Sequence, residues 1–171
     1  MEPGRVNCLA VDSSETSETA FNWYVKNYHQ KNDTLLIVHI HEVPQLPMMK
    51  VLSDAYCGDF YSVPHYFFPN NEQYRTQIKK SIEEAKAIVE KFKTFCVEKE
   101  IKFNEIVLDD NFKSPGYMIC ELAKKKAATV IVMGQRGLGA ISRLFLGSTS
   151  DYVLHHSDVP VIVIPPTISS R

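Results

Sequence analysis

Long hydrophobic runs are missing from this chain. No stretch approaches the roughly 18 consecutive apolar residues that a membrane-spanning helix needs, so we expect no membrane span. The first residues, MEPGRVNCLAVDSSE, lack the basic region and long apolar stretch of a secretory signal peptide. Cysteine is scarce as well, since the chain has only 4, and none forms a C-x-x-C pair that would indicate zinc or redox chemistry. We therefore expect reduced, mostly buried cysteines and a cytoplasmic protein, with the nucleus left open as an alternative.

The chain also has no excess of either charge. It carries 19 Lys and Arg against 20 Asp and Glu, which leaves a formal net charge of −1. General binders of nucleic acid or of anionic membranes usually show a basic excess, so neither partner is expected. The one lysine triplet, Lys124 to Lys126, falls where a helix is expected to end, and cations are favourable there. Neither the G-x-S-x-G motif of a nucleophile elbow nor the G-x-x-x-x-G-K-[ST] loop is present.

What the chain does have is a regular alternation of short apolar runs and helical patterns. Its 171 residues suit one domain, residues 1–171. A first helix is expected after Asp12-Ser13-Ser14, and a second runs to about Cys96, with Asn71 as its cap. The alternation predicts the α/β class, a doubly wound parallel sheet with helices on both faces. The expected strands are Val6–Val11, Leu35–Ile40, Ile101–Leu108, Thr129–Met133 and Val159–Ile164. Apolar and polar residues alternate in Ile101–Leu108, which predicts a strand at the edge of the sheet. The later helices are expected to begin at Ser114-Pro115 and at Ser148.

One segment breaks this alternation, at about residues 44–72. Four prolines and a glycine interrupt it, and it is rich in tyrosine and phenylalanine. It reads as an irregular insertion in the domain. An unstructured loop of this length is unusual in a compact domain and is often functional.

The most informative feature follows the fourth expected strand. The strand ends in Gly134, Gly137 comes three residues later, and nine residues separate Gly137 from Gly147. A run of hydroxyl residues, Ser148 to Ser150, then opens a helix. The start of a helix offers unpaired backbone N–H groups and the positive end of its dipole, and glycines let a ligand approach the backbone closely. This pattern predicts a phosphate site, although the same hydroxyl residues are also suited to capping the helix.

The topology points to the same place. In doubly wound sheets, ligands bind beyond the carboxyl ends of the strands, at the point where the strand order reverses. Asp12 follows the first strand there, and the glycine loop follows the fourth. The alternative for Asp12 is that it only caps the first helix.

Arginines and histidines supply further candidates. A helix start provides only about half a unit charge, so the phosphates need more. Arg136, between two glycines of the loop, is the preferred cation, with Arg143 or Mg²⁺ as alternatives. His39 and His41 lie two residues apart on one strand and share a face, but no third metal ligand is visible at a suitable spacing. We therefore interpret them, like His155 and His156 at a helix end, as structural or surface residues.

The spacing Gly134-x-x-Gly137, nine residues, then Gly147-Ser148 resembles the nucleotide-binding signature of the universal stress protein family. The flanking strands agree, with Ala10-Val11-Asp12 ending the first strand, Val38-His39-Ile40 ending the second and a Val-Pro-Val motif opening the last. The resemblance covers essentially the whole chain except the insertion.

This resemblance implies a flavodoxin-like sheet in the order 3-2-1-4-5, binding of ATP (or ADP or AMP) and a homodimer formed through Val161 to Ile164. Ala10, Val11 and Asp12 would line the adenosine, Ile40 would meet the adenine edge through its backbone, and Met133 would pack on the nucleoside. The phosphates would be wrapped by Gly134, Arg136, Gly137, Gly147, Ser148, Thr149 and Ser150.

The sequence therefore predicts an adenine-nucleotide-binding protein that acts as a stress-response binding or regulatory module. No catalytic base is evident, so any ATP hydrolysis is expected to be slow. Two alternatives stay open. One is a nucleotide-free protein whose aromatic insertion docks a partner, and the other is a true hydrolase or transferase on the same scaffold.

Overall fold

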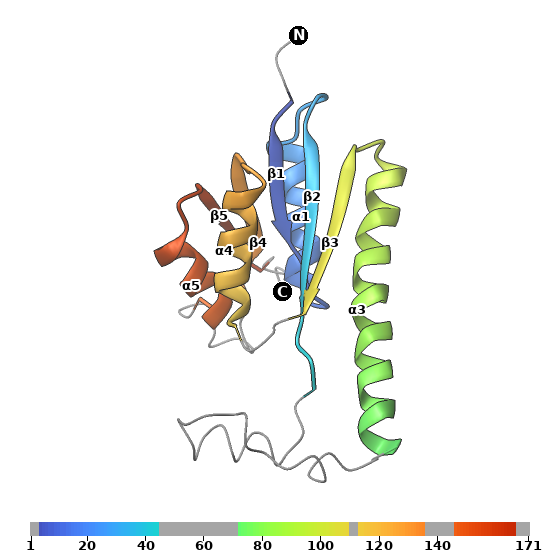
Figure 1. Cartoon of the computed structure of the whole chain (residues 1–171). Helices are drawn as coiled ribbons and strands as arrows, with labels where there is room; N and C mark the ends of the chain where they lie inside the picture. Colours follow the sequence, from blue (N-terminus) through green and yellow to red (C-terminus); the bar gives the residue numbers. More distant parts are fainter. Residues whose placement is uncertain (1–3, 45–71, 110–112, 136–145, 167–171) are drawn as a thin grey trace, which may run out of the picture.

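The computed structural model describes residues 4–44, 72–109, 113–135 and 146–166. Strands and helices alternate along these residues, as Figure 1 shows. In chain order the elements are β1 (Val6–Ala10), α1 (Glu15–Asn27), β2 (Thr34–His41), α3 (Glu72–Glu98), β3 (Phe103–Asp109), α4 (Pro115–Lys125), β4 (Val130–Gly134), α5 (Ser148–His156) and β5 (Val161–Ile164).

The strands form one parallel sheet in the order β3-β2-β1-β4-β5. This confirms the predicted doubly wound α/β class, the predicted order and the edge position of β3. The order reverses between β1 and β4, because the chain adds strands on one side of β1 up to β3 and on the other side from β4 onward. Ligands of doubly wound sheets bind at such a reversal.

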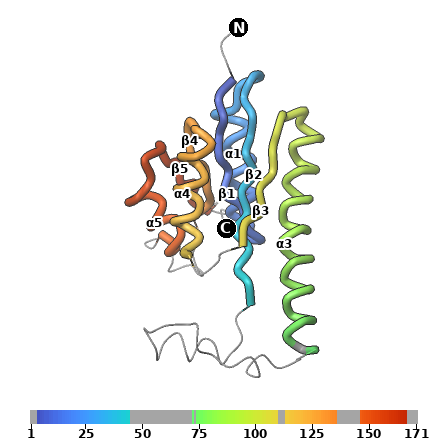
Figure 2. The backbone as a smooth tube through the Cα atoms, in the orientation of Figure 1, coloured from blue at the N-terminus to red at the C-terminus, as the bar shows by residue number. Residues whose placement is uncertain are grey.

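The helices cover both faces of the sheet (Figures 1 and 2). On one face α1 and α3 bury a core that contains Leu9, Phe21 and Phe92. On the other face α4 and α5 cover a second core, which contains Ala10, Ile119 and Val153. Successive residues of a strand point to opposite faces, so the mainly apolar central strands supply both cores at once.

Local chemistry sets the helix ends. Ser14 is the N-cap of α1, where its side chain accepts a hydrogen bond from the Ser17 N–H, and Ser114 caps α4 ahead of Pro115. Lysines occupy the last turn of α4, as predicted. After α3 and α4 the chain turns through Glu100 at φ 53° and Ala127 at φ 49°, a left-handed conformation that glycine usually occupies.

Strands β3 and β5 each begin two residues later than the sequence pattern predicts. Ile101 is buried, but its N–H donates to the Cys96 carbonyl and so closes the end of α3 before β3 starts. Pro160 has no N–H to donate, and its carbonyl accepts from the Ile131 N–H just ahead of β5. In both places a specific hydrogen bond, which an apolar pattern does not reveal, sets the boundary.

A polar network lies at the amino end of the sheet, away from the strand ends at which ligands bind. Arg5 donates to both carboxylate oxygens of Asp33, at 2.9 and 2.6 Å, and Asn7 donates to the same carboxylate and to the Tyr24 hydroxyl. Burial alone would raise the pKa of Asp33, but the Arg5 guanidinium and the Gln30 N–H outweigh it, so the pKa lies below its ordinary value. The network ties the start of β1 to the turn before β2.

Several predictions fall partly outside the described residues. Nearly all of the insertion at 44–72 lies outside the described residues. Asn71, the expected cap, and Cys57 lie outside them as well. The described cysteines Cys8 and Cys96 are buried and unpaired, and Cys120 is unpaired and partly buried. Burial raises the pKa of the Cys8 thiol to about 12, which keeps it protonated and unreactive. Of the helices in the described ranges, none has the length and apolarity to cross a membrane.

Candidate functional site

A cavity of about 290 Å³ lies where the carboxyl ends of β1, β2 and β4 meet. This volume is near the lower end of the roughly 300–1,000 Å³ of small-molecule sites. Segments far apart in the sequence contribute to its wall, because parallel strands bring their carboxyl ends to one edge of the sheet. Beyond the strand ends, the wall includes residues from the start of α5, the start of α4 and the middle of α3.

The structure brings together eight of the residues that the sequence analysis selected. The eight that line the cavity are Ala10, Val11, Asp12, Ile40, Met133, Gly134, Thr149 and Ser150. Gly147 and Ser148 precede Thr149 at the start of α5 but are not part of the wall. Arg136, Gly137 and Arg143 lie outside the described residues.

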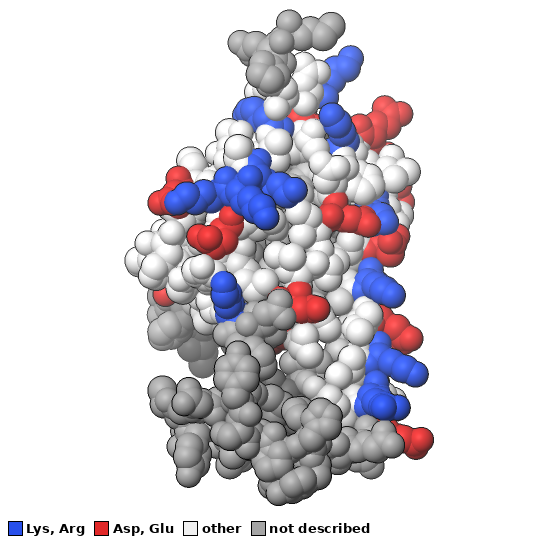
Figure 3. Space-filling model, viewed as in Figure 1, with Lys and Arg blue, Asp and Glu red and all other residues white. Residues whose placement is uncertain are grey.

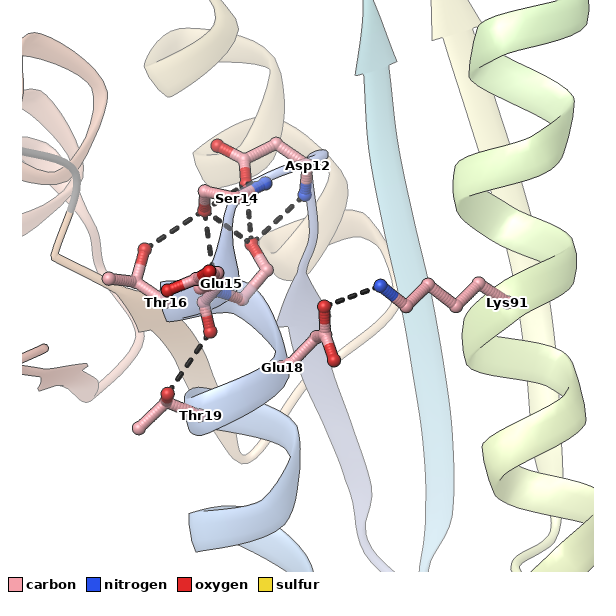
Figure 4. A network of polar contacts seen from close by, with 8 residues as sticks. Asp12, Ser14, Glu15, Thr16, Glu18, Thr19 and Lys91 are labelled. Carbon is pink, nitrogen blue, oxygen red and sulfur yellow. Dashed lines mark hydrogen bonds and ion pairs between the residues drawn. The ribbon is translucent and has the colours of Figure 1, made fainter. Parts of the chain in front are cut away.

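At the end of β1, Asp12 organises the first turn of α1 (Figure 4). Its Oδ1 accepts hydrogen bonds from the Ser14 N–H at 2.9 Å, from the Ser17 hydroxyl at 2.7 Å and from the Ser14 hydroxyl. Ser14, and not Asp12, caps the helix, so the alternative that Asp12 is the N-cap is wrong. The network holds the Asp12 carboxylate in a fixed position at the cavity wall.

At the end of β2, two histidines face the α3 side of the sheet. His39 Nδ1 lies 2.9 Å from the Val11 carbonyl oxygen, and His41 Nδ1 lies 2.9 Å from Asp109 Oδ1. Both side chains are buried and both residues line the cavity. The side chain of Ile40, between them, faces the α4 side and packs against the second core.

At the end of β4, Gly134 allows two segments to touch. A Cβ at this position would lie 2.6 Å from the backbone carbon and oxygen of Thr16, which is too close for any side chain. One further hydrogen bond to β5 follows the end of the strand, because the Gln135 N–H donates to the Ile164 carbonyl. Gly134 therefore allows α1 to pack closely against the end of β4 at the cavity wall.

Among the described residues, no side chain caps the start of α5. Its N-cap is Gly147, with no side-chain hydrogen bond to the helix among the described residues. The Ser150 hydroxyl instead donates to the Gly147 carbonyl at 3.0 Å. The alternative that the hydroxyls from Ser148 to Ser150 cap the helix is therefore wrong. In contrast to α1 and α4, the first N–H groups of α5 meet no capping side chain within the described ranges, and such groups suit an anion.

The described part of the cavity wall is acidic. It includes the carboxylates of Asp12, Glu42 and Glu84, and no lysine or arginine belongs to that described lining. Positive side chains lie elsewhere: in Figure 3 they gather over the end of α4 and alternate with negative ones along α3. Among the described residues, the backbone amides at the start of α5 are therefore the groups that can bind an anionic ligand. A positive charge to balance it has to come from a metal ion or from residues outside the described ranges.

Sequence reasoning missed part of this wall. Pro115 and Ile119 come from α4, and Ser81, Glu84, Ala85 and Ile88 come from α3. An ion pair between Glu18 of α1 and Lys91 helps to place α3 beside α1 (Figure 4). The α3 residues form an ordinary helix face, so only the packing of α3 beside β2 shows that they meet a ligand cavity. The described ranges contain no group of three or more His, Cys, Asp or Glu residues arranged to hold a metal ion.

A doubly wound parallel sheet with a cavity at its strand reversal defines a class of small-ligand-binding domains. The profile of the universal stress protein family matches residues 59–165, which is more than half of the chain. The chain therefore belongs to the universal stress protein family.

Individual relatives agree with this assignment. Universal stress protein YxiE of Bacillus subtilis is 26% identical over 156 residues, which cover 91% of this chain and 95% of YxiE. A solved family member from Arabidopsis thaliana with AMP bound has a TM-score of 0.62 at 18% identity, over 96% of this chain and 93% of the other. A universal stress protein in complex with cAMP has a TM-score of 0.52 at 17% identity, over 96% and 98%. At these identities the two structures establish the shared fold.

Proposed function

We propose that this protein binds an adenine nucleotide (ATP, ADP or AMP) in the cavity and acts as a stress-response binding or regulatory module. The observation that carries the proposal is the meeting of eight residues from four separate segments around one cavity at the strand reversal. Two relatives of the same fold, solved with AMP and with cAMP, add support.

The charges around the cavity suggest how the nucleotide lies. The adenosine would rest against Asp12, Ile40 and Met133, where the Asp12 carboxylate would accept hydrogen bonds from ribose hydroxyls. The phosphates would lie at the start of α5, away from Glu42 and Glu84, because like charges repel. The residues that we propose for the phosphates are Gly134, Arg136, Gly137, Gly147, Ser148, Thr149 and Ser150, with Arg143 or Mg²⁺ supplying further positive charge.

Two further elements complete the proposal. We propose a homodimer in which the β5 edges meet, because β5 is an edge strand whose residues Val161, Ile162 and Val163 are only partly buried. An exposed apolar edge of this kind invites pairing with another strand. We also propose a cytoplasmic location, in keeping with the unpaired thiols of the described cysteines.

Thermal unfolding with and without nucleotide tests the proposal. A ligand at a hundredfold excess over its dissociation constant stabilises a fold by about 2.7 kcal/mol, which raises the melting temperature measurably. We expect such a shift with AMP, and with ATP and Mg²⁺, but not with inorganic phosphate. Mass spectrometry of small molecules released on denaturation would show which nucleotide co-purifies.

The alternatives predict different results. No shift at millimolar AMP or ATP, with no nucleotide released, would favour a nucleotide-free interaction module. Steady phosphate release from ATP that Asp12→Ala or Arg136→Ala abolishes, with the fold intact, would instead indicate a hydrolase.

A further inference from the structure

Gly116, in the first turn of α4, packs directly against Tyr152 of α5. The residue is buried, and glycine is a poor helix former, so its presence here has to serve packing. A Cβ at position 116 would lie 2.8 Å from both Cβ and Cδ1 of Tyr152. Ordinary contacts between carbon atoms are roughly 3.5–4.0 Å long. The missing side chain therefore lets the two helices, which lie side by side in Figure 1, approach each other closely.

Tyr152 also contacts its own helix one turn later. The rings of Tyr152 and His156 stack, with their centroids 4.1 Å apart and an angle of 12° between their planes. His156 Nδ1 donates a hydrogen bond of 2.9 Å to the Tyr152 carbonyl oxygen, because a carbonyl can only accept. The Tyr152 ring is thus held by two contacts, one on each helix.

The contact between the two helices lies close to the cavity wall. Pro115, next to Gly116 in α4, lines the cavity, and so do Thr149 and Ser150, which lie within one turn of Tyr152 in α5. The approach of the helices therefore sets where the start of α5 lies relative to the rest of the wall. The N–H groups at this start, which no described side chain caps, are those proposed to bind the phosphates.

We propose that the contact between Gly116 and Tyr152 positions the start of α5 for the phosphate of the ligand, which makes both of them positioning residues. The inference rests on the proposed function, since it concerns the same cavity. Neither residue belongs to the described cavity lining, so both act through the backbone of α5.

The geometry of the contact explains why it is sensitive. Rotation of the Tyr152 side chain cannot relieve a clash at its Cβ, because this atom is attached directly to the helix backbone. A side chain at position 116 must therefore move the helices apart, by about 1 Å if ordinary carbon contacts are to be restored. We expect the N–H groups of α5 to shift by a similar amount, which is enough to break hydrogen bonds to a phosphate.

The test compares AMP with adenosine, which share base and ribose and differ only in the phosphate. The ratio of their dissociation constants, measured by titration calorimetry, reports the contribution of the phosphate and cancels general changes in the fold. For the wild-type chain we expect AMP to bind about tenfold more tightly or better, since hydrogen bonds to a charged group are strong.

Substitutions on both sides of the contact separate positioning from general stability. In Gly116→Ala the preference for AMP should fall to within about twofold, while the affinity for adenosine is kept. Tyr152→Phe keeps the ring and should keep the preference. Tyr152→Ala removes the ring without adding a clash, so it gives a second reading if Gly116→Ala does not fold, and its preference should fall about threefold. Tyr117→Ala is the matched control, because Tyr117 follows Gly116, is half-buried and lies outside the described cavity lining.

The possible results are distinct. An undiminished preference in Gly116→Ala and Tyr152→Ala would overturn the positioning role while leaving the proposed function standing. Equal losses of affinity for AMP and adenosine, or an equal fall in preference in Tyr117→Ala, would do the same. Binding of neither ligand by the wild-type chain would overturn the proposed function and the positioning role together.

Discussion

Gly134 of β4 and Thr16 of α1 lie in direct backbone contact, with only 2.6 Å between a Cβ built at position 134 and the Thr16 carbonyl. The contact joins the two ends that form the strand reversal, the end of β1 with its helix and the end of β4. The shape of the cavity therefore depends on the absence of a side chain at position 134.

Gly134→Ala should destabilise the fold by roughly 1–3 kcal/mol, because the new methyl group forces backbone shifts in a packed region. Urea unfolding followed by circular dichroism measures the change. Gly147→Ala is the control, since its φ of −59° is open to any residue. Equal stability of the wild-type and Gly134→Ala chains would contradict the packing role.

Asp12→Asn should separate the local role of Asp12 from its proposed ligand role. The asparagine oxygen can still accept from the Ser14 N–H and the Ser17 hydroxyl, so the melting temperature should change little. Loss of the negative charge weakens hydrogen bonds from ribose hydroxyls, and AMP affinity should fall about tenfold. Asp12→Ala should lower both stability and affinity. Unchanged AMP affinity in Asp12→Asn, measured by calorimetry, would rule out the ribose contact.

Asp33→Asn should destabilise the chain by about 2–3 kcal/mol at neutral pH, because it removes one member of a largely buried ion pair. The folded-state pKa of Asp33 is lowered, so its contribution is present above the unfolded-state pKa of about 3.9 and is lost as the pH falls through the folded-state value. The difference in unfolding free energy between the two chains should therefore shrink as the pH drops below about 4. Urea unfolding at a series of pH values measures this difference in unfolding free energy. A difference that grows in acid would show that folding raises, and does not lower, the pKa of Asp33.

Ala127→Gly should stabilise the chain by about 0.5–1 kcal/mol. Ala127 is exposed and has φ 49°, a conformation that costs an ordinary residue more than it costs glycine. Lys125→Gly, only two residues earlier at the last position of α4, should have the opposite sign and cost up to about 1 kcal/mol. The two variants are compared by urea unfolding; destabilisation by both would show that the left-handed turn carries no strain.

Val163→Lys should convert the proposed homodimer to a monomer, because a charge on the β5 edge strand opposes strand pairing. Val107→Lys is the matched control, since Val107 is 44% exposed on β3, the opposite edge of the sheet. Light scattering coupled to gel filtration measures the mass of each. A wild-type monomer would contradict the homodimer, and a dimer that persists in Val163→Lys and dissociates in Val107→Lys would place the interface elsewhere.

The local pattern was enough to predict the layout of the chain. Apolar runs such as Leu35–Ile40 and caps such as Ser114-Pro115 act through neighbouring residues, so they can be read without knowing the fold. The site was partly accessible for the same reason. Asp12 and Gly134 immediately follow strands, and the parallel topology carries strand ends to one edge.

The amino-acid sequence by itself determined the order of strands and helices, the class of the sheet and the glycine and hydroxyl residues that follow its fourth strand, because these depend on periodicity and local hydrogen bonding. Only the tertiary structure decided that Ser14 caps α1, that no described side chain caps α5, that Glu84 of α3 reaches the cavity and that Asp109 orients His41. Glu84 and Asp109 are far in the chain from the residues that they meet. At the two helix starts, several hydroxyl and carboxyl groups are suited to capping, and only the folded geometry selects among them. A sequence pattern does not predict such contacts, because they depend on the three-dimensional arrangement of the elements.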